Sequence, residues 1–91
     1  MSSYTNQKDN LLKRLSRAEG QIRGVSRMVA EDKYCMDVIT QISAVQAALD
    51  KVSLELLREH TRHCLAAETS PDTRAARADE LVEVMKRLLA R

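Results

Sequence analysis

Three side chains in this sequence have the chemistry of soft-metal ligands: Cys35, His60 and Cys64. His60 and Cys64 are four residues apart, so on a helix they project from the same face, about one turn apart. A thiolate and an imidazole in that arrangement form half of a metal site. An isolated pair of this kind is more often a buried cysteine beside a surface histidine, so the pair alone does not establish a site.

The third candidate, Cys35, lies 25 residues before His60. Along one straight helix this separation is ~37 Å, because each residue advances the helix by ~1.5 Å. The three groups therefore cannot meet within one helix, but they can meet when two copies of it pair antiparallel. The crossing point then lies near residues 48–49, within the alanine-rich segment 44–49 whose small side chains would permit close approach. Such a homodimer contains two identical sites.

Two thiolates and one imidazole favour Cu(I) or Zn(II) among biological metal ions. Zinc usually takes four ligands in a tetrahedron, whereas three ligands with two sulfurs suit a trigonal Cu(I) ion. His63 is a possible fourth ligand, but it directly precedes Cys64 and so projects ~100° away from it on a helix. We therefore interpret His63 as a bystander. The donor set predicts Cu(I), one ion per protomer, at intersubunit sites.

The remaining sequence predicts an all-α fold, because glycine and proline are scarce and apolar residues recur at helical spacing. The first helix is expected to begin near Asn6, whose side chain would cap it, and to end at the turn 31–33. A second helix runs from about Tyr34 to about Ala66. A third begins at Ser70, a capping residue followed by proline. The predicted apolar stripes are Leu11, Leu15, Ala18, Ile22, Val25 and Val29 in the first helix, Val38, Ile42, Val45, Leu49, Val52 and Leu56 in the second, and Leu81, Val84, Met85 and Leu88 in the third, which ends in the basic residues Lys86, Arg87 and Arg91.

Length and composition predict one domain, residues 1–91, that is completed by other copies of the chain. The chain has no Trp or Phe, yet 44% of its residues are hydrophobic, so we expect much of the apolar surface to be buried between protomers. No nucleophile–base arrangement or cofactor loop indicates an enzyme. No apolar stretch approaches the ~20 residues of a membrane span, and no secretory signal is apparent, so we expect a cytoplasmic protein without a membrane partner.

Basic residues are concentrated in the first third of the chain. Residues 1–33 contain seven basic side chains and four acidic ones, a net charge of plus three. A patch of this sign can attract the phosphates of nucleic acid, although a solvated charged face is an alternative interpretation. The candidate DNA-binding residues in this region are Lys13, Arg14, Arg17 and Arg23.

The whole chain resembles the CsoR/RcnR family of small helical metal-sensing repressors, and in particular its copper-sensing CsoR branch. The resemblance rests on motifs distributed over the first two helices, together with the spacing Cys35…His60-x-x-x-Cys64. These motifs are Arg14-Leu15, Gly20-Gln21-Ile22-Arg23-Gly24, Tyr34-Cys35-Met36-Asp37-Val38 and Gln41-Ile42-Ser43-Ala44-Val45-Gln46.

The resemblance implies a three-helix protomer, an antiparallel four-helix-bundle dimer and a homotetramer assembled as a dimer of dimers. It implies that the metal-free protein binds a GC-rich inverted-repeat operator, and that copper weakens this binding so that copper efflux or resistance genes are expressed. Tyr34 and Glu80 match the residues that surround the ligand histidine in copper-sensing members. Arg14 and Lys51 match basic positions implicated in operator binding.

Features that distinguish the branches of this family also favour copper. Nickel and cobalt sensors have an N-terminal His ligand and a His as the last ligand. Here the N-terminal segment has no His, and the last candidate ligand is Cys64. Position 2 is Ser, not the Pro of formaldehyde sensors, and His60 is present, unlike in persulfide sensors. Two alternatives stay open: a thiol-redox or persulfide-sensing repressor of the same fold, and a metal buffer without a DNA role.

Overall fold

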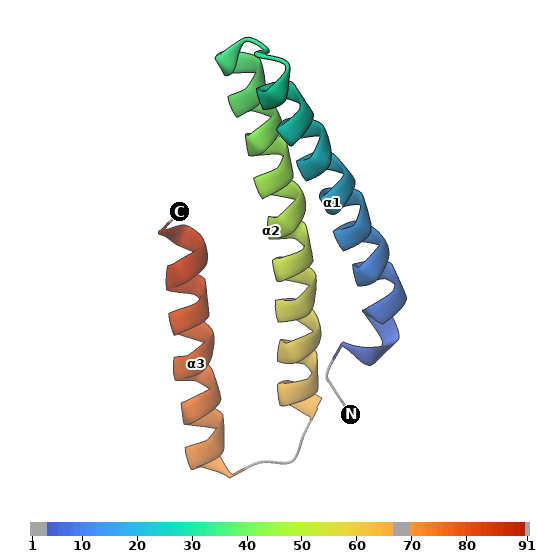
Figure 1. The fold of residues 1–91 in the computed structure, drawn as a ribbon. Helices are drawn as coiled ribbons and strands as arrows, with labels where there is room; N and C mark the ends of the chain where they lie inside the picture. Colours follow the sequence, from blue (N-terminus) through green and yellow to red (C-terminus); the bar gives the residue numbers. More distant parts are fainter. Residues whose placement is uncertain (1–3, 67–69, 91) are drawn as a thin grey trace.

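The computed structural model describes residues 4–66 and 70–90, and within these ranges the chain is helical and contains no strand. A short 3₁₀ turn, η1 (Thr5–Gln7), leads into α1 (Lys8–Ala30), which is followed by α2 (Cys35–Ala66) and α3 (Pro71–Leu89). The principal extents are 56 × 28 × 12 Å, so the protomer is long and only about as thick as one helix. Figure 1 shows the three helices side by side, with α2 between the other two. The predicted all-α, three-helix protomer is confirmed.

The start of α1 differs from the prediction, because Asn6 does not cap the helix. Asn6 lies inside η1, and the residue preceding α1 is Gln7, whose side chain makes no capping hydrogen bond. The backbone itself closes this turn, since the amide of Gln7 donates to the carbonyl of Tyr4 at 2.9 Å. Asp9 occupies the first turn, where its negative charge complements the helix dipole.

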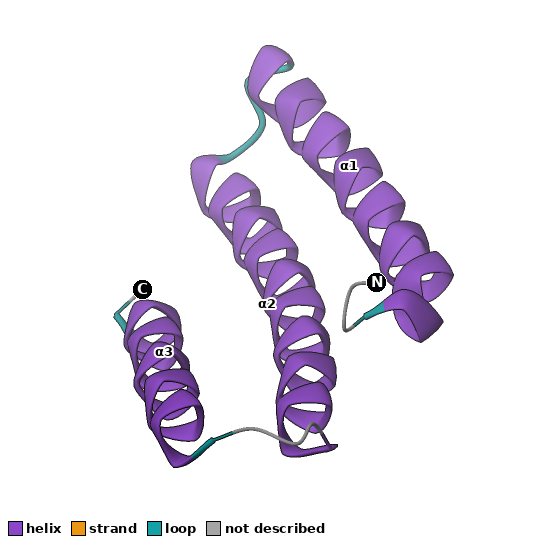
Figure 2. Ribbon diagram, turned by 90° about the horizontal axis from the view of Figure 1, so that it is seen from below, coloured by secondary structure: helices purple, strands orange, loops and turns teal. Residues whose placement is uncertain are grey.

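The turn between α1 and α2 folds the two helices into an antiparallel hairpin. Asp32 adopts a positive φ of 55°, and the amides of Asp32 and Lys33 donate to the carbonyls of Val29 and Met28 at 3.1 and 3.0 Å. This is the Schellman arrangement that ends a helix, here with an aspartate in the position that glycine usually occupies. The carbonyl of Tyr34 then accepts from the amides of Asp37 and Val38, and Cys35 is the first residue of α2. Figure 2 shows the turn that joins α1 to α2.

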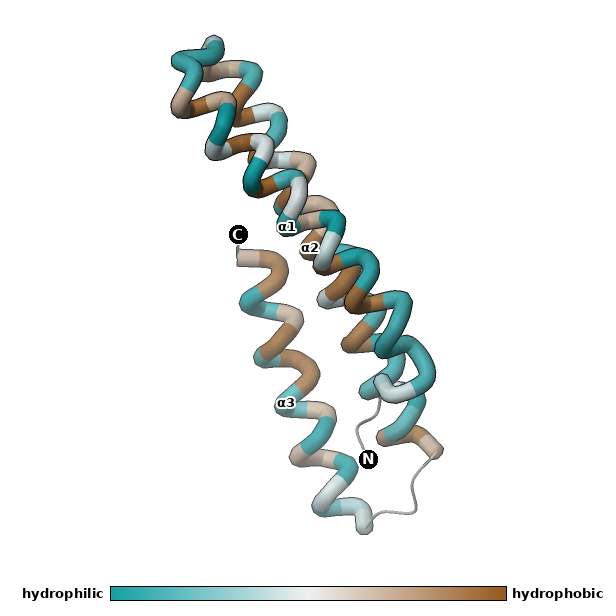
Figure 3. The backbone as a smooth tube through the Cα atoms, turned by 45° about the vertical axis from the view of Figure 1, so that its right-hand side comes forward, coloured by the Kyte–Doolittle hydropathy of each residue, from teal (hydrophilic) through white to brown (hydrophobic). Residues whose placement is uncertain are grey.

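The contact between α1 and α2 buries two of the six residues in the predicted stripe of α1 and three of the six in that of α2. The buried apolar side chains are Leu11 and Ala18 on α1, and Val38, Val45 and Val52 on α2. The alternate members of the stripes, including Leu15, Ile22, Ile42 and Leu49, remain between 37% and 48% exposed. Figure 3 shows how hydrophobic and hydrophilic residues alternate along both helices. Among the described residues, none of the helices has the length and apolar character that spanning a membrane requires.

The third helix begins as predicted, but of the four residues in its predicted apolar stripe Met85 is 45% exposed. The Oγ atom of Ser70 accepts a hydrogen bond from the amide of Thr73 at 3.2 Å, and proline occupies the first helical position. In Figures 1 and 2, α3 runs along the C-terminal half of α2, on the side away from α1. Its half-buried apolar residues are Leu81, Val84 and Leu88. Lys86 and Arg87 occupy its last turn, whereas Arg91 and the N-terminal residues Ser2 and Ser3 lie outside the described residues.

The Ser70 cap gives a prediction for stability. Ser70→Ala removes the side-chain acceptor of the first turn of α3, and the expected cost is about 1 kcal/mol in the free energy of unfolding. Thermal unfolding measures it, with Ser26→Ala as the control, because Ser26 is exposed within α1 and alanine is favourable there. Equal melting temperatures for Ser70→Ala and Ser26→Ala would contradict the prediction.

Candidate metal centre and nucleic-acid interface

His60 and Cys64 lie together on the last turns of α2. The Sγ atom of Cys64 is 3.6 Å from Nε2 of His60, and both side chains are half-buried. Metal bonds to sulfur and nitrogen are ~2.0–2.3 Å long, so two donors at this separation can share one ion after small adjustments. A thiolate and an imidazole also match the preference of a soft metal. The pair therefore has the chemistry of half of a Cu(I) site.

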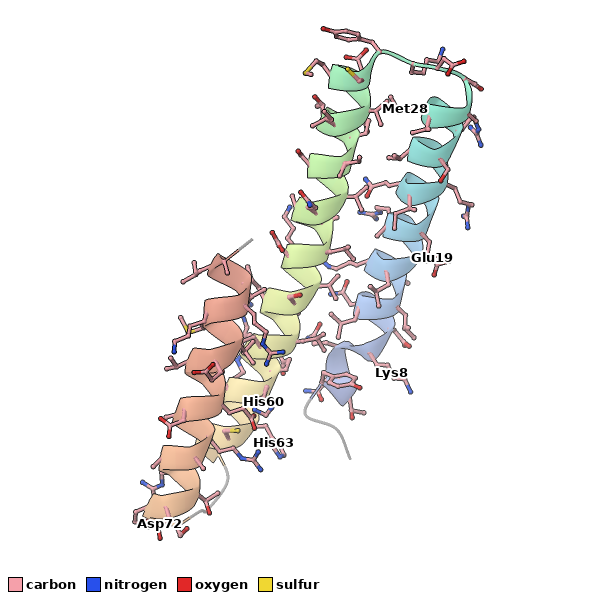
Figure 4. All side chains as sticks on the ribbon, turned by 60° about the vertical axis from the view of Figure 1, so that its left-hand side comes forward. Lys8, Glu19, Met28, His60, His63 and Asp72 are labelled. Atoms are coloured by element: carbon pink, nitrogen blue, oxygen red, sulfur yellow. The ribbon has the colours of Figure 1, made fainter. Side chains whose placement is uncertain are left out.

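Glu80 on α3 contacts the same imidazole. Its Oε1 atom lies 3.3 Å from Nε2 of His60, and its Oε2 atom lies 3.6 Å from Nη1 of Arg77. Figure 4 shows His60 on the part of α2 that runs beside α3. In this structure Nε2 of His60 thus faces both Glu80 and Sγ of Cys64. A carboxylate on Nε2 fixes the tautomer of the histidine and leaves Nδ1 for a metal, so the ring has to turn for Nδ1 and the thiolate to share one ion. Residue spacing did not indicate this contact, because it depends on how α3 packs; only the family resemblance indicated Glu80.

The other two predicted site residues are far from this pair within the protomer. Cys35 is the first residue of α2 and is exposed, at ~37 Å of helix from His60. Tyr34 precedes it and is 67% exposed. No group of three metal-binding side chains occurs in one protomer within the described ranges. The protomer thus brings together His60, Cys64 and Glu80, and keeps Cys35 and Tyr34 apart from them.

The candidate ligands nevertheless share one side of α2. Since successive residues turn by ~100°, His60 and Cys64 each project within roughly 20° of the direction of Cys35. This ligand-bearing side also carries Ile42 and Leu49, which are 42% and 38% exposed. The alanines of the segment 44–49 lie on other sides of the helix by the same geometry. The interpretation that they line the crossing of two ligand-sharing helices is therefore not supported.

A groove of about 610 Å³ opens next to the His60–Cys64 pair. Its walls are the end of α2 and the first half of α3, and they include His63, Arg74 and Leu81. The exposed His63 borders this groove without belonging to any group of three donors in the described part of the chain. The groove leaves the two candidate ligands accessible from outside the protomer.

Most of the predicted DNA-binding residues lie together on the opposite flank of the hairpin. Relative to the buried line through Leu11 and Ala18, Arg14 and Arg17 are turned by roughly 60° and 120° to one side. Lys51 is turned by roughly 120° to the equivalent side of the buried line of α2. In an antiparallel pair, equivalent flanks of the two helices face the same way, so Lys51 joins the α1 residues. All of these basic side chains are exposed.

The other two predicted DNA-binding residues, Lys13 and Arg23, differ in their position relative to this surface. Lys13 projects from the outer side of α1, next to the flank of Arg14 and Arg17. Arg23, in contrast, is turned by roughly 120° to the other side of the buried line. Both are exposed. The face defined by Lys13, Arg14, Arg17 and Lys51, called here the basic face, thus lies on the hairpin opposite the ligand-bearing side of α2.

Comparisons with known proteins found similar chains among transcriptional repressors. Over 62 residues the chain is 64% identical to the copper-sensing transcriptional repressor RicR of Mycobacterium tuberculosis, which covers 68% of this chain and 65% of RicR. It is 44% identical over 81 residues to the copper-sensing transcriptional repressor CsoR of Bacillus subtilis, covering 89% of this chain and 80% of that protein. The aligned part of the chain therefore spans just under two thirds of the length of RicR.

A solved structure shares the fold. The copper-sensing repressor CsoR with Cu(I) from Geobacillus thermodenitrificans NG80-2 superposes with a TM-score of 0.80 at 42% identity, over 92% of this chain and 88% of that one. The family model of metal-sensitive transcriptional repressors matches residues 7–87, which include the hairpin, the His60–Cys64 pair and Glu80. The chain therefore belongs to the family of metal-sensitive transcriptional repressors, as its resemblance to the CsoR/RcnR family predicted.

Proposed function

We propose that this protein is a Cu(I)-responsive transcriptional repressor, which binds operator DNA when metal-free and releases it on binding Cu(I), so that copper efflux or resistance genes are expressed. The observation that carries the proposal is the His60–Cys64 pair, whose thiol sulfur lies 3.6 Å from the imidazole ring at Nε2, on the side of α2 that also bears Cys35. The names of the relatives RicR and CsoR, both copper-sensing repressors, support copper as the ligand. A repressor acts by binding, so the protein is not an enzyme.

The exposed apolar side of the hairpin supports a homodimer. Leu12, Leu15 and Ile22 on α1 and Ile39, Ile42 and Leu49 on α2 lie on the ligand-bearing side and are between 37% and 54% exposed. Burying such a surface against the same surface of a second copy gives an antiparallel four-helix bundle around a two-fold axis. Two such dimers form the proposed homotetramer, in which each protomer, residues 1–91, acts as one domain.

In this dimer each Cu(I) site takes Cys35 from one protomer and His60 and Cys64 from its partner, giving one ion per protomer. Cu(I) would supply three strong bonds in a trigonal geometry that two thiolates and an imidazole satisfy. Ligation by these residues ties the end of α2 in one protomer to the start of α2 in the other. Glu80 and the incoming Tyr34 hold the second nitrogen of His60, which connects α3 to the same site.

The DNA-binding surface is proposed to be the basic face, with Arg14 and Lys51 as principal contacts, and Arg23 is proposed to contact DNA from the other flank of α1. Exposed lysines and arginines supply the affinity for phosphates, while the two-fold symmetry of the assembly suits an inverted repeat, here proposed to be GC-rich. A bacterial-type repressor acts on chromosomal DNA, so we place its action in the cytoplasm. Release follows if Cu(I) binds more tightly to a shape of the oligomer that fits DNA less well.

A thiol-redox repressor of the same fold is the second candidate. The observation that favours it is that Cys35 and Cys64 are both free thiols, with Cys35 exposed. In the proposed dimer these two cysteines come from different protomers and could be cross-linked by an oxidant or a persulfide. His60 and its contact with Glu80 have no role in that chemistry, which is why Cu(I) is preferred.

The deciding experiment measures DNA binding by the parent protein under anaerobic conditions, with and without one equivalent of Cu(I) per chain. The proposed function requires binding that weakens steeply with salt and a clear loss of affinity with Cu(I). Loss of affinity with a persulfide but not with Cu(I) would favour the thiol-redox candidate. If the metal-free protein does not bind DNA, although the protein does bind Cu(I), a metal buffer would be indicated instead.

A further inference from the structure

Two arginines outside the proposed DNA contacts, Arg58 and Arg62, continue the basic face along α2. Both project within roughly 20° of the direction of Lys51, because they follow it by seven and eleven residues. Their side chains are 62% and 69% exposed. Lys51, Arg58 and Arg62, called here the basic line, thus lie on the side of α2 nearly opposite the candidate ligands.

Each of these arginines forms an ion pair with a carboxylate that is less exposed than the arginine itself. Nη1 of Arg58 is 3.7 Å from Oε2 of Glu55, and Nη1 of Arg62 is 3.5 Å from Oε1 of Glu59. The acid side chains are only 23% and 8% exposed, far less than the arginines above them. Each carboxylate thus lies within ion-pair distance of its arginine, whose planar guanidinium carries five N–H donors and can contact more than one acceptor.

Glu59 is anchored by its place in the protein core. It follows Val38, Val45 and Val52 at intervals of seven residues, and so continues the line of α2 that faces α1. It is the buried charged residue in the described part of the chain, with 6% of its surface exposed. A carboxylate held at this depth is costly unless it is paired, and Arg62 supplies the pairing. Arg62 is therefore the exposed charge that pairs with this buried carboxylate.

The dimensions of the basic line suit a nucleic-acid backbone. Eleven residues of helix separate Lys51 from Arg62, which corresponds to ~16 Å. Each strand of a DNA duplex carries one phosphate per ~3.4 Å along the axis, so the line spans about five phosphates. α1 and α2 are antiparallel, so the C-terminal half of α2 runs toward the end of the hairpin where α1 begins (Figure 1). The basic line lies on this half of α2 and runs in that direction.

We propose that Arg58 and Arg62 bind phosphates of the DNA backbone and extend the basic face to the turn of α2 that carries His60 and Cys64. The inference rests on the proposed DNA-binding function and adds the residues that bring DNA to the metal-binding turn. Arg62 lies between His60 and Cys64 in the sequence but projects from the opposite side of the helix. Reorientation of this turn on Cu(I) binding therefore moves a DNA-binding side chain directly.

The test is fluorescence anisotropy with a long mixed-sequence DNA duplex at several salt concentrations, since binding to phosphates does not depend on the operator sequence. Arg58→Ala and Arg62→Ala should each weaken binding and reduce the slope of log K against log salt by about 0.9 for every phosphate that the variant no longer neutralises. Arg14→Ala is the reference, because it removes a principal residue of the proposed basic face. Arg87→Ala on α3 is the control, because it removes an exposed positive charge outside the basic line.

Several outcomes would overturn the inference while leaving the proposed function intact. One is an unchanged slope in both Arg58→Ala and Arg62→Ala when Arg14→Ala reduces it. Another is a slope of log K against log salt that is reduced in Arg62→Lys as much as in Arg62→Ala. Lysine keeps the positive charge, so an equal reduction would indicate a structural role for Arg62. Cu(I) should also weaken DNA binding by a smaller factor in Arg62→Ala than in Arg58→Ala, and equal factors would overturn the direct link. A parent protein with no salt-dependent DNA binding would instead contradict the proposed function.

Discussion

Cys35→Ala is expected to lower the affinity for Cu(I) by more than ~100-fold. Removing a group that only supports a metal ligand costs up to ~100-fold in affinity, and removing a ligand itself should cost more. Cys35 supplies one of only three proposed donors, and no other cysteine or histidine lies near it within the described protomer. DNA affinity of the metal-free variant should equal that of the parent, because Cys35 projects from the side of α2 opposite the basic line. Anaerobic competition against a Cu(I) chelator measures the first quantity, and anisotropy with DNA measures the second.

A mixing experiment tests whether the site is shared between protomers. His63→Ala is the matched control and should bind Cu(I) like the parent, since His63 lies next to Cys64 without joining a group of donors. Cys35→Ala combined in one dimer with the double variant His60→Ala, Cys64→Ala should regain one intact site per dimer. If neither the mixture nor the separate variants bind Cu(I), while the parent does, the intersubunit assignment is wrong. Full affinity in Cys35→Ala alone would exclude Cys35 as a ligand.

Glu80→Ala is expected to bind Cu(I) but to release DNA poorly. Coupling between two ligands of one protein is typically 5–150-fold in affinity, about 1–3 kcal/mol. Glu80 holds Nε2 of His60 at 3.3 Å and belongs to α3, so it connects the imidazole to a second helix. Without it, ligation of His60 no longer pulls on α3, and the factor by which Cu(I) lowers DNA affinity should fall close to one. The measurement is DNA affinity with and without saturating Cu(I), together with Cu(I) affinity.

Glu83→Ala provides the control for this variant. Glu83 lies three residues further along α3, is 65% exposed and pairs with Lys86 at 3.1 Å, away from His60. It removes the same charge from the same helix and should retain the coupling of the parent. If Cu(I) lowers the DNA affinity of Glu80→Ala by the same factor as in Glu83→Ala and the parent, Glu80 has no part in transmitting the signal.

The sequence by itself determined the three helices, and it determined that the metal site cannot lie within one protomer. Helical spacing of apolar residues predicted all three helices, and Ser70 predicted the start of α3, because caps and amphipathic patterns are local properties. The separation of 25 positions between Cys35 and His60 excluded a site within one protomer, because both residues lie on one helix, α2. Asn6 was the local prediction that failed, since a backbone turn closed by Gln7 and Tyr4 took the place of a side-chain cap.

Only the tertiary structure decided which sides of these helices meet. Periodicity marks an apolar stripe but does not say which half packs inside the protomer, and here Val45 is buried while Ile42 and Leu49 are exposed. The contact of Glu80 with His60 joins residues 20 positions apart on two helices, so it follows from the packing of α3 and not from spacing. The placement of the candidate ligands and the basic line on opposite sides of α2 likewise acquires meaning only once α1 and α3 are in position. Contacts between helices depend on non-local packing energy, which a pattern along the chain does not contain.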